Sequence, residues 1–259
     1  MLKMKELQEY LNESLLDDFG EQSKDAAKRH VIETWLEKNH ESANRNRWPL
    51  KYKINKDYTI DINIFFYVGE GNFPEFIQFN KCSGNFLVSN SNMTSLRGCP
   101  QYVEGTFDCK NNKLKTLDGG PKRVDKSYTC YNNELTSLKG CPEYIGGNFD
   151  CSYNFLKTLD GGPKHVGGNY ECYNNGLTSL RGCPQCVGSV FNCSGNFLKT
   201  LDGGPKTVKG SYFCRSNTLQ TLDGGPTDCN IIYMSDNPKL SDDEIEKYRQ
   251  RHPKVRVIK

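Results

Sequence analysis

Few side chains in this sequence have types and spacings that could support catalysis. None of its four histidines has a serine, cysteine or carboxylate at the spacing of a catalytic triad, a zinc site or a metalloprotease helix. The recurring D-G-G-P motif supplies one aspartate per copy, which is too few alternating carboxylates for a calcium site. Its glycines also lack the following Lys-Ser/Thr of a phosphate-binding loop. We therefore expect no enzymatic activity, no metal and no cofactor.

The twelve cysteines could form a disulfide framework or a metal centre, but their spacing fits neither. Cys183 and Cys186 are the single CxxC pair, and Cys186 occupies a position that holds Tyr102 in a sister repeat. A lone CxxC pair is weak support for zinc. Most other cysteines recur at one fixed position of a repeated unit, from Cys109 to Cys214. We predict small buried thiols and no structural disulfide.

These cysteines belong to a 21-residue unit, L-x-x-L-x-G-[CG]-P-x-x-V-x-x-x-[FY]-x-C-x-x-N-x-L, that organises most of the chain. A fixed period of this length predicts a solenoid in which each repeat packs on its neighbours. The units alternate between G-C-P and G-G-P with a 42-residue super-period, which we interpret as a trace of duplication. The expected parallel strands are centred on Leu87, Asp108, Thr129, Asp150, Glu171, Asn192, Phe213 and Met234.

The apolar positions of the unit are expected to face a shared core. In one repeat and its neighbour these residues are Leu114, Leu117, Val124, Tyr128, Cys130 and Leu135. A row of asparagines runs from Asn112 to Asn217 at the same step. Since a side-chain amide donates and accepts at once, we expect this row to satisfy backbone groups in a buried turn.

The segments outside the repeats are expected to cover the open ends of the core. Residues 1–80 predict two helices, the second capped by Ser23, then a polar connection over 41–50 and a β-hairpin turning at 55–57.

The repeats occupy residues 81–240, and residues 241–259 form the other end. There a capping box of Ser241 and Glu244 predicts a helix, and alternating apolar residues after it predict a short strand.

The segment [FY]-x-C-x-x-N-x-L has the spacing of the leucine-rich-repeat signature, and the resemblance covers residues 86–240. The wording T-S-L-x-G-C-P-x-x-V-x-G-x-F-x-C-x-x-N resembles a family of leucine-rich-repeat proteins encoded by tailed phages and some bacteria. The resemblance implies an α/β repeat fold: a leucine-rich-repeat-like solenoid with a parallel β-sheet, a helical and β N-terminal cap and a helix-strand C-terminal cap. Members mostly lack an assigned activity, so it implies no reaction.

Residues that alternate with the buried ones vary between repeats and are the candidates for binding. They combine carboxylates with aromatic side chains, which is the composition of interface anchors. We predict a site on the concave sheet face at Asp108, Tyr131, Asp150, Tyr153, Glu171, Tyr173, Phe213 and Arg215, with Met234 on the same face. The alternative is a basic loop edge at Lys122, Arg123, Lys164 and Lys206.

The expected function is a non-enzymatic scaffold that binds a host or phage protein through the concave face. The phage resemblance implies interference with a host process, such as a defence system. One alternative is a phage virion or internal structural protein, since Leu11-Asn12-Glu13 matches the Leu-x-Glu processing site of T-even-like internal-protein leaders. Another is a sponge for a charged, nucleotide-like small molecule at the basic edge.

Charge and hydropathy narrow the partners and the location. The net charge of +3 argues against a nucleic-acid partner. No apolar run approaches the roughly 20 residues that cross a bilayer, and the first residues lack the features of a signal peptide. We expect a cytoplasmic protein without a membrane partner, in the host cytoplasm if the protein is phage-encoded.

Overall fold

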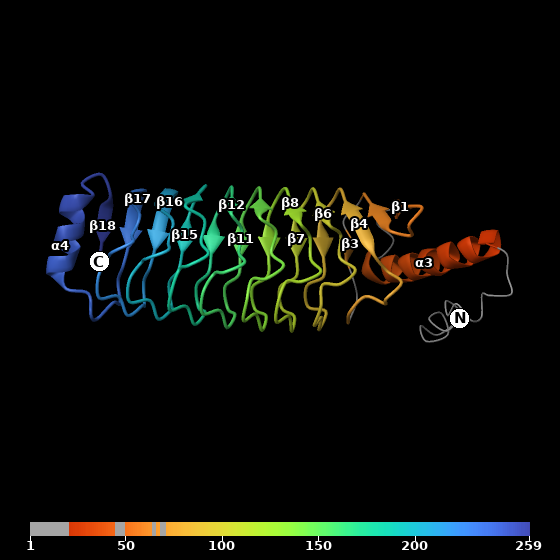
Figure 1. Ribbon diagram of the computed structural model, residues 1–259, viewed down its shortest axis with the longest axis horizontal. Helices are drawn as coiled ribbons and strands as arrows, with labels where there is room; N and C mark the ends of the chain where they lie inside the picture. The colour runs from red at the N-terminus through yellow and green to blue at the C-terminus, as the bar shows by residue number, and fades with distance from the viewer. Residues whose placement is uncertain (1–20, 45–49, 64–65, 68–70) are drawn as a thin grey trace.

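The computed structural model describes residues 21–44, 50–63, 66–67 and 71–259 as an elongated stack of short parallel strands (Figure 1). Within the described ranges, the helices lie outside the repeats, so the repeats are a parallel β-solenoid rather than an α/β arrangement. In the view of Figure 1 the rungs stack along a nearly straight line. We therefore use "strand face", without implying curvature, for the surface expected to be concave.

Each rung contributes two short strands that pair with the same positions one rung away. One ladder contains β4 (Phe79–Cys82), β6 (Tyr102–Val103), β8 (Arg123–Val124), β10 (Tyr144–Ile145), β12 (His165–Val166) and β14 (Cys186–Val187). The other contains β3 (Phe66–Tyr67), β5 (Phe86–Leu87), β7 (Phe107–Asp108), β9 (Tyr128–Thr129), β11 (Phe149–Asp150), β13 (Tyr170–Glu171) and β15 (Phe191–Asn192). Longer strands β16 (Thr207–Phe213) and β17 (Asp228–Tyr233) take part in both.

Only the second ladder matches the strands expected from the sequence. The first ladder is an addition, separated from the second by a tight bend in each rung. At that bend Gly146 lies so close to the rung before it that a Cβ would be 2.2 Å from the Asp125 carbonyl oxygen. Glycine is therefore required there by the close approach of two backbones.

The inward rows form one continuous core, as the sequence predicts. Leu114, Leu117, Val124, Tyr128, Cys130 and Leu135 are all fully buried. Burying a Val or Leu side chain contributes about 1.5–3 kcal/mol relative to exposure, before conformational entropy is counted. Because these side chains are covered mainly by the adjacent rungs, stability is shared along the stack.

The 42-residue super-period has a packing basis as well as an evolutionary one. Before the last repeat, rungs with Gly-Gly-Pro carry an inward tyrosine, whereas rungs with Gly-Cys-Pro carry an inward phenylalanine. At Gly204 a Cβ would lie 2.8 Å from the Tyr212 hydroxyl oxygen, so the glycine leaves room for that hydroxyl. Cysteine at the same position accompanies the smaller ring, as in the pair Cys183 and Phe191.

The asparagine row is the polar counterpart of this core, and its predicted role is confirmed. Asn133 Oδ1 accepts a hydrogen bond from the backbone N–H of Leu114 at 3.1 Å. Its Nδ2 donates to the backbone oxygens of Cys109 at 3.0 Å and Cys130 at 3.1 Å. Each amide thus joins its own rung to the preceding one.

At the N-terminal end, α3 (Glu21–Asn44) packs on the first rungs through Trp35, whose ring centroid lies 5.9 Å from Phe73 and 6.4 Å from Phe79. Ser23 lies inside α3, so its predicted role as a helix cap is wrong, and the helix also takes in 41–44 of the expected connection. The first predicted helix and the Leu11-Asn12-Glu13 motif lie outside the described residues.

The expected hairpin follows α3 in the chain. It consists of β1 (Tyr52–Ile54) and β2 (Ile60–Ile62), which pair antiparallel. Strand β2 also pairs in parallel with β4, so the ladder begins at the hairpin.

At the C-terminal end, α4 (Asp242–Arg251) follows Ser241, whose side-chain oxygen accepts from the Glu244 N–H at 3.3 Å. The Tyr248 hydroxyl donates to the Pro226 oxygen, and β18 (Arg256–Ile258) pairs with β17. The last repeat is one residue short.

Because of that missing residue, Tyr233 is the partner of Phe213 across the strands. Met234, expected on the strand face, is instead buried at 1% exposure.

Candidate protein-binding face

The strand face is the outward side of the second ladder, and its central strands are β7, β9, β11 and β13. These strands pair in that order, which places Asp108, Thr129, Asp150 and Glu171 in one row. Asp150 and Glu171 are direct partners across β11 and β13. Two carboxylates thus lie side by side on adjacent strands.

The central pair is partly buried, and this governs its electrostatics. Burial raises the pKa of the Asp150 carboxyl, although hydrogen bonds from Ser152 partly oppose the rise. Those bonds come from the Ser152 N–H at 3.0 Å and its hydroxyl at 2.5 Å. Burial also raises the pKa of Glu171, and the nearby Asp150 charge adds to the rise, although a hydrogen bond with the Asn192 side chain partly opposes it. Neither carboxylate has an ion-pair partner among the residues that the structure describes.

Asp108 differs from this pair because it has its own counter-charge. It is only 8% exposed, and its carboxylate lies 3.0 Å from the Lys110 Nζ. The hydrogen bond to Asp108 raises the pKa of Lys110. The sequence predicts Asp108 as an exposed residue of the binding face, whereas in the structure its carboxylate is buried and paired with Lys110.

Tyrosines border the central carboxylates. Tyr131 and Tyr173 are half-buried and occupy the same row as Ser152, which is completely buried between their rungs. Tyr153, which is 50% exposed, packs edge-to-face on Tyr173 with 5.2 Å between ring centroids.

Tyr153 also has an unusual backbone conformation. Its φ is 52°, in the left-handed region, where the equivalent positions in three other repeats hold Asn111, Asn132 and Asn174. A bulky residue in that region costs roughly 1–2 kcal/mol, and asparagine tolerates it better. The chain therefore keeps an exposed tyrosine at a position where it destabilises the fold.

Phe213 and Arg215 form a second group farther along the strand face, beyond β15. Phe213 stacks on Tyr233 with ring centroids 4.7 Å apart, and the Arg215 guanidinium lies 4.7 Å from the centroid of Tyr233. Tyr233 was missed as a site residue because the shortened last repeat shifts the repeat frame by one position.

The predicted basic edge follows the first ladder. Of its members, Arg123 pairs with Asp125 at 2.8 Å, and Lys164 pairs with Glu143 at 2.5 Å. The Lys206 Nζ donates to the Gly224 oxygen at 2.8 Å. Of the four, only Lys122 makes neither an ion pair nor a side-chain hydrogen bond within the ranges that the structure describes. Three of the four predicted cations are therefore engaged within the molecule.

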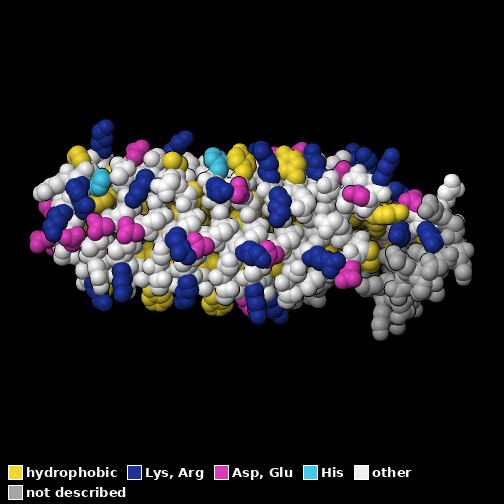
Figure 2. Space-filling view, viewed as in Figure 1, with side chains coloured by type: hydrophobic (Ala, Val, Ile, Leu, Met, Phe, Trp, Pro, Cys, Tyr) yellow, Lys and Arg dark blue, Asp and Glu magenta, His cyan; other side chains and the backbone are white. Residues whose placement is uncertain are grey.

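A stack of rings beside these cations was not predicted. The Arg123 guanidinium lies 4.6 Å from the ring centroid of Tyr144, and Tyr144 stacks on His165 at 4.8 Å with nearly parallel planes. Figure 2 shows basic, hydrophobic and histidine side chains together along the upper edge of the molecule. Arg123 and His165 thus both pack on the Tyr144 ring, which is still 37% exposed.

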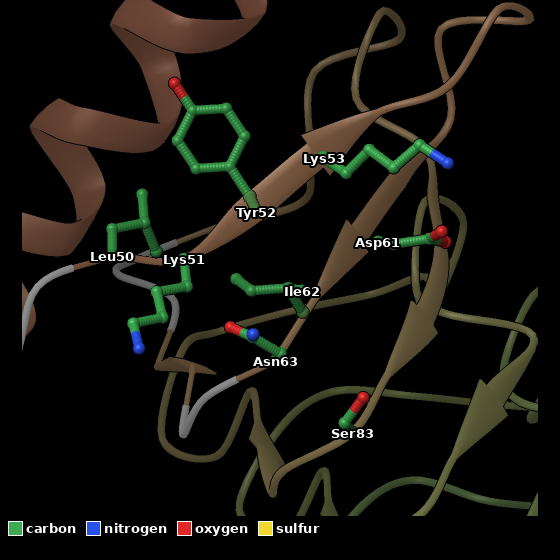
Figure 3. Close-up of a pocket in the computed structure, with 8 residues that line it drawn as sticks. All are labelled: Leu50, Lys51, Tyr52, Lys53, Asp61, Ile62, Asn63 and Ser83. Atoms are coloured by element: carbon green, nitrogen blue, oxygen red, sulfur yellow. The ribbon is translucent and has the colours of Figure 1, made fainter.

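A hollow of about 360 Å³ lies beside the β1–β2 hairpin (Figure 3). Its polar residues include Lys51, Lys53, Asp61 and Ser83. The ammonium groups of Lys51 and Lys53 extend away from one another, and Asp61 accepts a hydrogen bond from Asn80 Nδ2 at 2.7 Å. The polar groups do not converge as those of a ligand site do.

Other classes of site find no support within the described ranges. No three or more His, Cys, Asp or Glu side chains there gather where they could hold a metal ion. No helix in those ranges combines the length and apolar character needed to cross a bilayer. The ladder cysteines are buried thiols, and burial raises the pKa of Cys193 to about 12, which makes that thiol a poor nucleophile.

Searches against known proteins add no relative: no protein-family model and no curated protein matches this chain.

Proposed function

We propose that the protein is a non-enzymatic scaffold that binds another protein through the strand face. The contact centre is formed by Tyr131, Asp150, Tyr153, Glu171 and Tyr173. The observation that carries the proposal is Tyr153, an exposed aromatic residue held in the left-handed region beside Tyr173. The turn imposes this backbone conformation on other repeats too, but it does not require a tyrosine there, and residues strained in this way cluster at functional sites.

The chemistry of the contact centre favours a partner with a cationic group. Asp150 and Glu171 lie side by side without an ion pair in the described structure, and burial raises the pKa of both, although the Lys110 charge partly opposes the rise at Asp150. A lysine or arginine from a partner would relieve this unfavourable arrangement. Tyrosines beside such a charge pair bury large areas with few torsions to fix.

The biological context of the proposal rests on the sequence resemblance. The leucine-rich-repeat identity, the phage origin and a host protein as the partner, such as a component of a defence system, belong to this proposal. The straight stack with varied outward residues supports it, since solenoids provide extended binding surfaces.

The test uses immobilised full-length protein to retain partners from host lysate, comparing Tyr153→Ala/Tyr173→Ala with Lys122→Ala/Lys164→Ala. Loss of a hot-spot tyrosine costs about 2 kcal/mol or more, so we expect at least a thirtyfold weaker affinity for the tyrosine pair. The lysine pair is the matched control, and both must melt cooperatively. Loss of the partner with the lysine pair alone would contradict the strand-face proposal and favour a charged small molecule or acidic protein at the basic edge.

A further inference from the structure

Two phenylalanines stand out on the surface at the turn that follows the strand face. Phe155 is 63% exposed and Phe197 is 59% exposed, which makes them the most exposed large hydrophobic side chains in the described structure. Both occupy the turn position directly after the ladder asparagine. The same position in other repeats holds polar residues, namely Lys113, Glu134 and Thr218.

The position between the two phenylalanines holds Gly176, which has no side chain to stand between the rings, and we call this position the notch. Equivalent backbone hydrogen bonds fix all three residues to the rung before, at 2.9 Å for Phe155, 3.0 Å for Gly176 and 2.9 Å for Phe197. Adjacent rungs are about 4.8 Å apart, so the two rings project roughly 10 Å apart along the axis. That spacing admits one side chain of a ligand between them.

The notch is cationic. The Lys157 side chain reaches across to the next rung and covers Gly176, which is buried, so that a Cβ on Gly176 would be 2.5 Å from the Lys157 Nζ. Lys199 occupies the same position as Lys157 two rungs farther on, and both are exposed. Neither makes an ion pair with any residue that the structure describes. Figure 2 shows hydrophobic side chains protruding between Lys and Arg side chains along the lower edge.

We propose that this notch, formed by Phe155, Lys157, Gly176, Phe197 and Lys199, binds an acidic peptide segment. The methylene groups of a glutamate or an adjacent apolar side chain fit between the rings, and the carboxylates meet the two unpaired ammonium groups. A peptide is favoured over single-stranded nucleic acid because two ammonium groups and a net charge of only +3 offer little attraction to a phosphate backbone. The site differs in charge from the neighbouring strand face, whose carboxylates favour a cationic partner.

A display library of random dodecapeptides, panned on the immobilised full chain, tests this proposal. Gly176→Met fills the notch, and it needs only the flexible Lys157 ammonium to move because Gly176 is not in the left-handed region. Thr218→Met places the same side chain at the same repeat position elsewhere. We expect wild type and Thr218→Met to enrich peptides with an apolar residue flanked by Asp or Glu.

For a resynthesised, fluorescein-labelled peptide from that selection, we expect anisotropy titrations to show about tenfold weaker binding to Gly176→Met. Phe155→Ser/Phe197→Ser should weaken it similarly, and this second variant decides the test if Gly176→Met does not fold. Tyr173→Ala should leave binding unchanged, which separates this site from the strand face.

The proposal would be overturned if the selection enriched no peptides or enriched basic ones. It would also be overturned if the notch variants bound the peptide as tightly as wild type, or if Thr218→Met weakened binding as much as Gly176→Met. A labelled oligothymidylate that binds wild type and is released by Gly176→Met would assign the notch to nucleic acid instead.

Discussion

Asn154 shows how much of this fold depends on single amides. Its Nδ2 donates to three backbone oxygens, those of Cys130, Cys151 and Ser152, each at 3.1 Å. Its Oδ1 accepts from the Leu135 N–H at 3.0 Å. Five per cent exposure leaves no water to replace these bonds. The side chain therefore acts as a connector between rungs.

Asn154→Ala should lower stability much more than a change at Asn111, which lies half-buried in an outer row. The Asn111 amide donates to Asn90 Oδ1 at 2.9 Å and accepts from Asn132 Nδ2 at 2.8 Å, but both bonds are exposed, so water can replace them. Each unsatisfied buried backbone group costs about 1–3 kcal/mol. The control is Asn111→Gly, because Asn111 has a φ of 55°, where alanine would add strain of its own. We expect the control within about 0.5 kcal/mol of wild type in urea unfolding. Equal losses for the two variants would show that the ladder asparagines are not the connectors.

The carboxylates of the strand face predict a pH effect at the same scale. Burial raises the folded-state pKa of Glu171 above its unfolded value, so the protonated form stabilises the fold. That stability is present below the unfolded pKa and is lost as pH rises through the folded pKa. Glu171→Gln mimics the protonated form. It should therefore raise the melting temperature at pH 7 and match wild type at acidic pH.

Glu134→Gln, on an exposed turn, is the control for that comparison. A Glu171→Gln variant less stable than wild type at pH 7 would mean that the carboxylate has a stabilising partner.

At the scale of the rung, an inward tyrosine goes with Gly-Gly-Pro and an inward phenylalanine goes with Gly-Cys-Pro. Gly204→Cys places a side chain against the Tyr212 hydroxyl and should destabilise the fold by about 1–3 kcal/mol through overpacking. Adding Tyr212→Phe removes the buried hydroxyl that a side chain at Gly204 would meet. The double variant reproduces the natural pair Cys183 and Phe191, and we expect it to recover part of the loss.

Urea unfolding of the four proteins gives the coupling energy between the two positions. A recovery of about 0.5 kcal/mol or more is expected for residues in contact. If the losses in unfolding free energy of the two single variants simply add in the double variant, the packing explanation is wrong and the super-period is only a trace of duplication.

The second ladder could be predicted from the sequence because [FY]-x-C alternates buried and outward residues in every repeat. The first ladder could not be, since a two-residue strand such as Tyr102–Val103 has one inward residue and no alternation. Its pairing depends on the rungs above and below, which are distant in sequence. The alternation of buried and outward residues also predicts an outward Ser152, but this small side chain lies buried between the rungs of its tyrosine neighbours.

Phe155 and Phe197 could have been singled out from the sequence, although not from the alternation of buried and outward residues. They are large aromatic residues at a repeat position otherwise held by lysine, glutamate, glycine or threonine. The strain at Tyr153 was harder to foresee. The left-handed conformation of that position follows from the shape of the turn and becomes visible only in the backbone.

At the scale of the whole molecule, the cysteines of the stack are expected to remain thiols. The ladder cysteines Cys109 to Cys214 are free and buried, and burial away from solvent makes a thiol inert to oxidation. Thiol titration in denaturant without reductant should therefore find close to twelve thiols per chain. A count of four or fewer would contradict this, and mass spectrometry after alkylation would locate the bonded pairs.

The alternation of tyrosine and phenylalanine rungs also sets a rule for how such a chain can change in length. Loss or gain of a single repeat by recombination would place two like rungs together and break the match of hydroxyl to glycine. Loss or gain of a pair of adjacent repeats preserves it. The chain can therefore lengthen or shorten by two rungs at once, roughly 10 Å at a time, with its interior unchanged. An array that changes length in this way therefore keeps an even or an odd number of rungs.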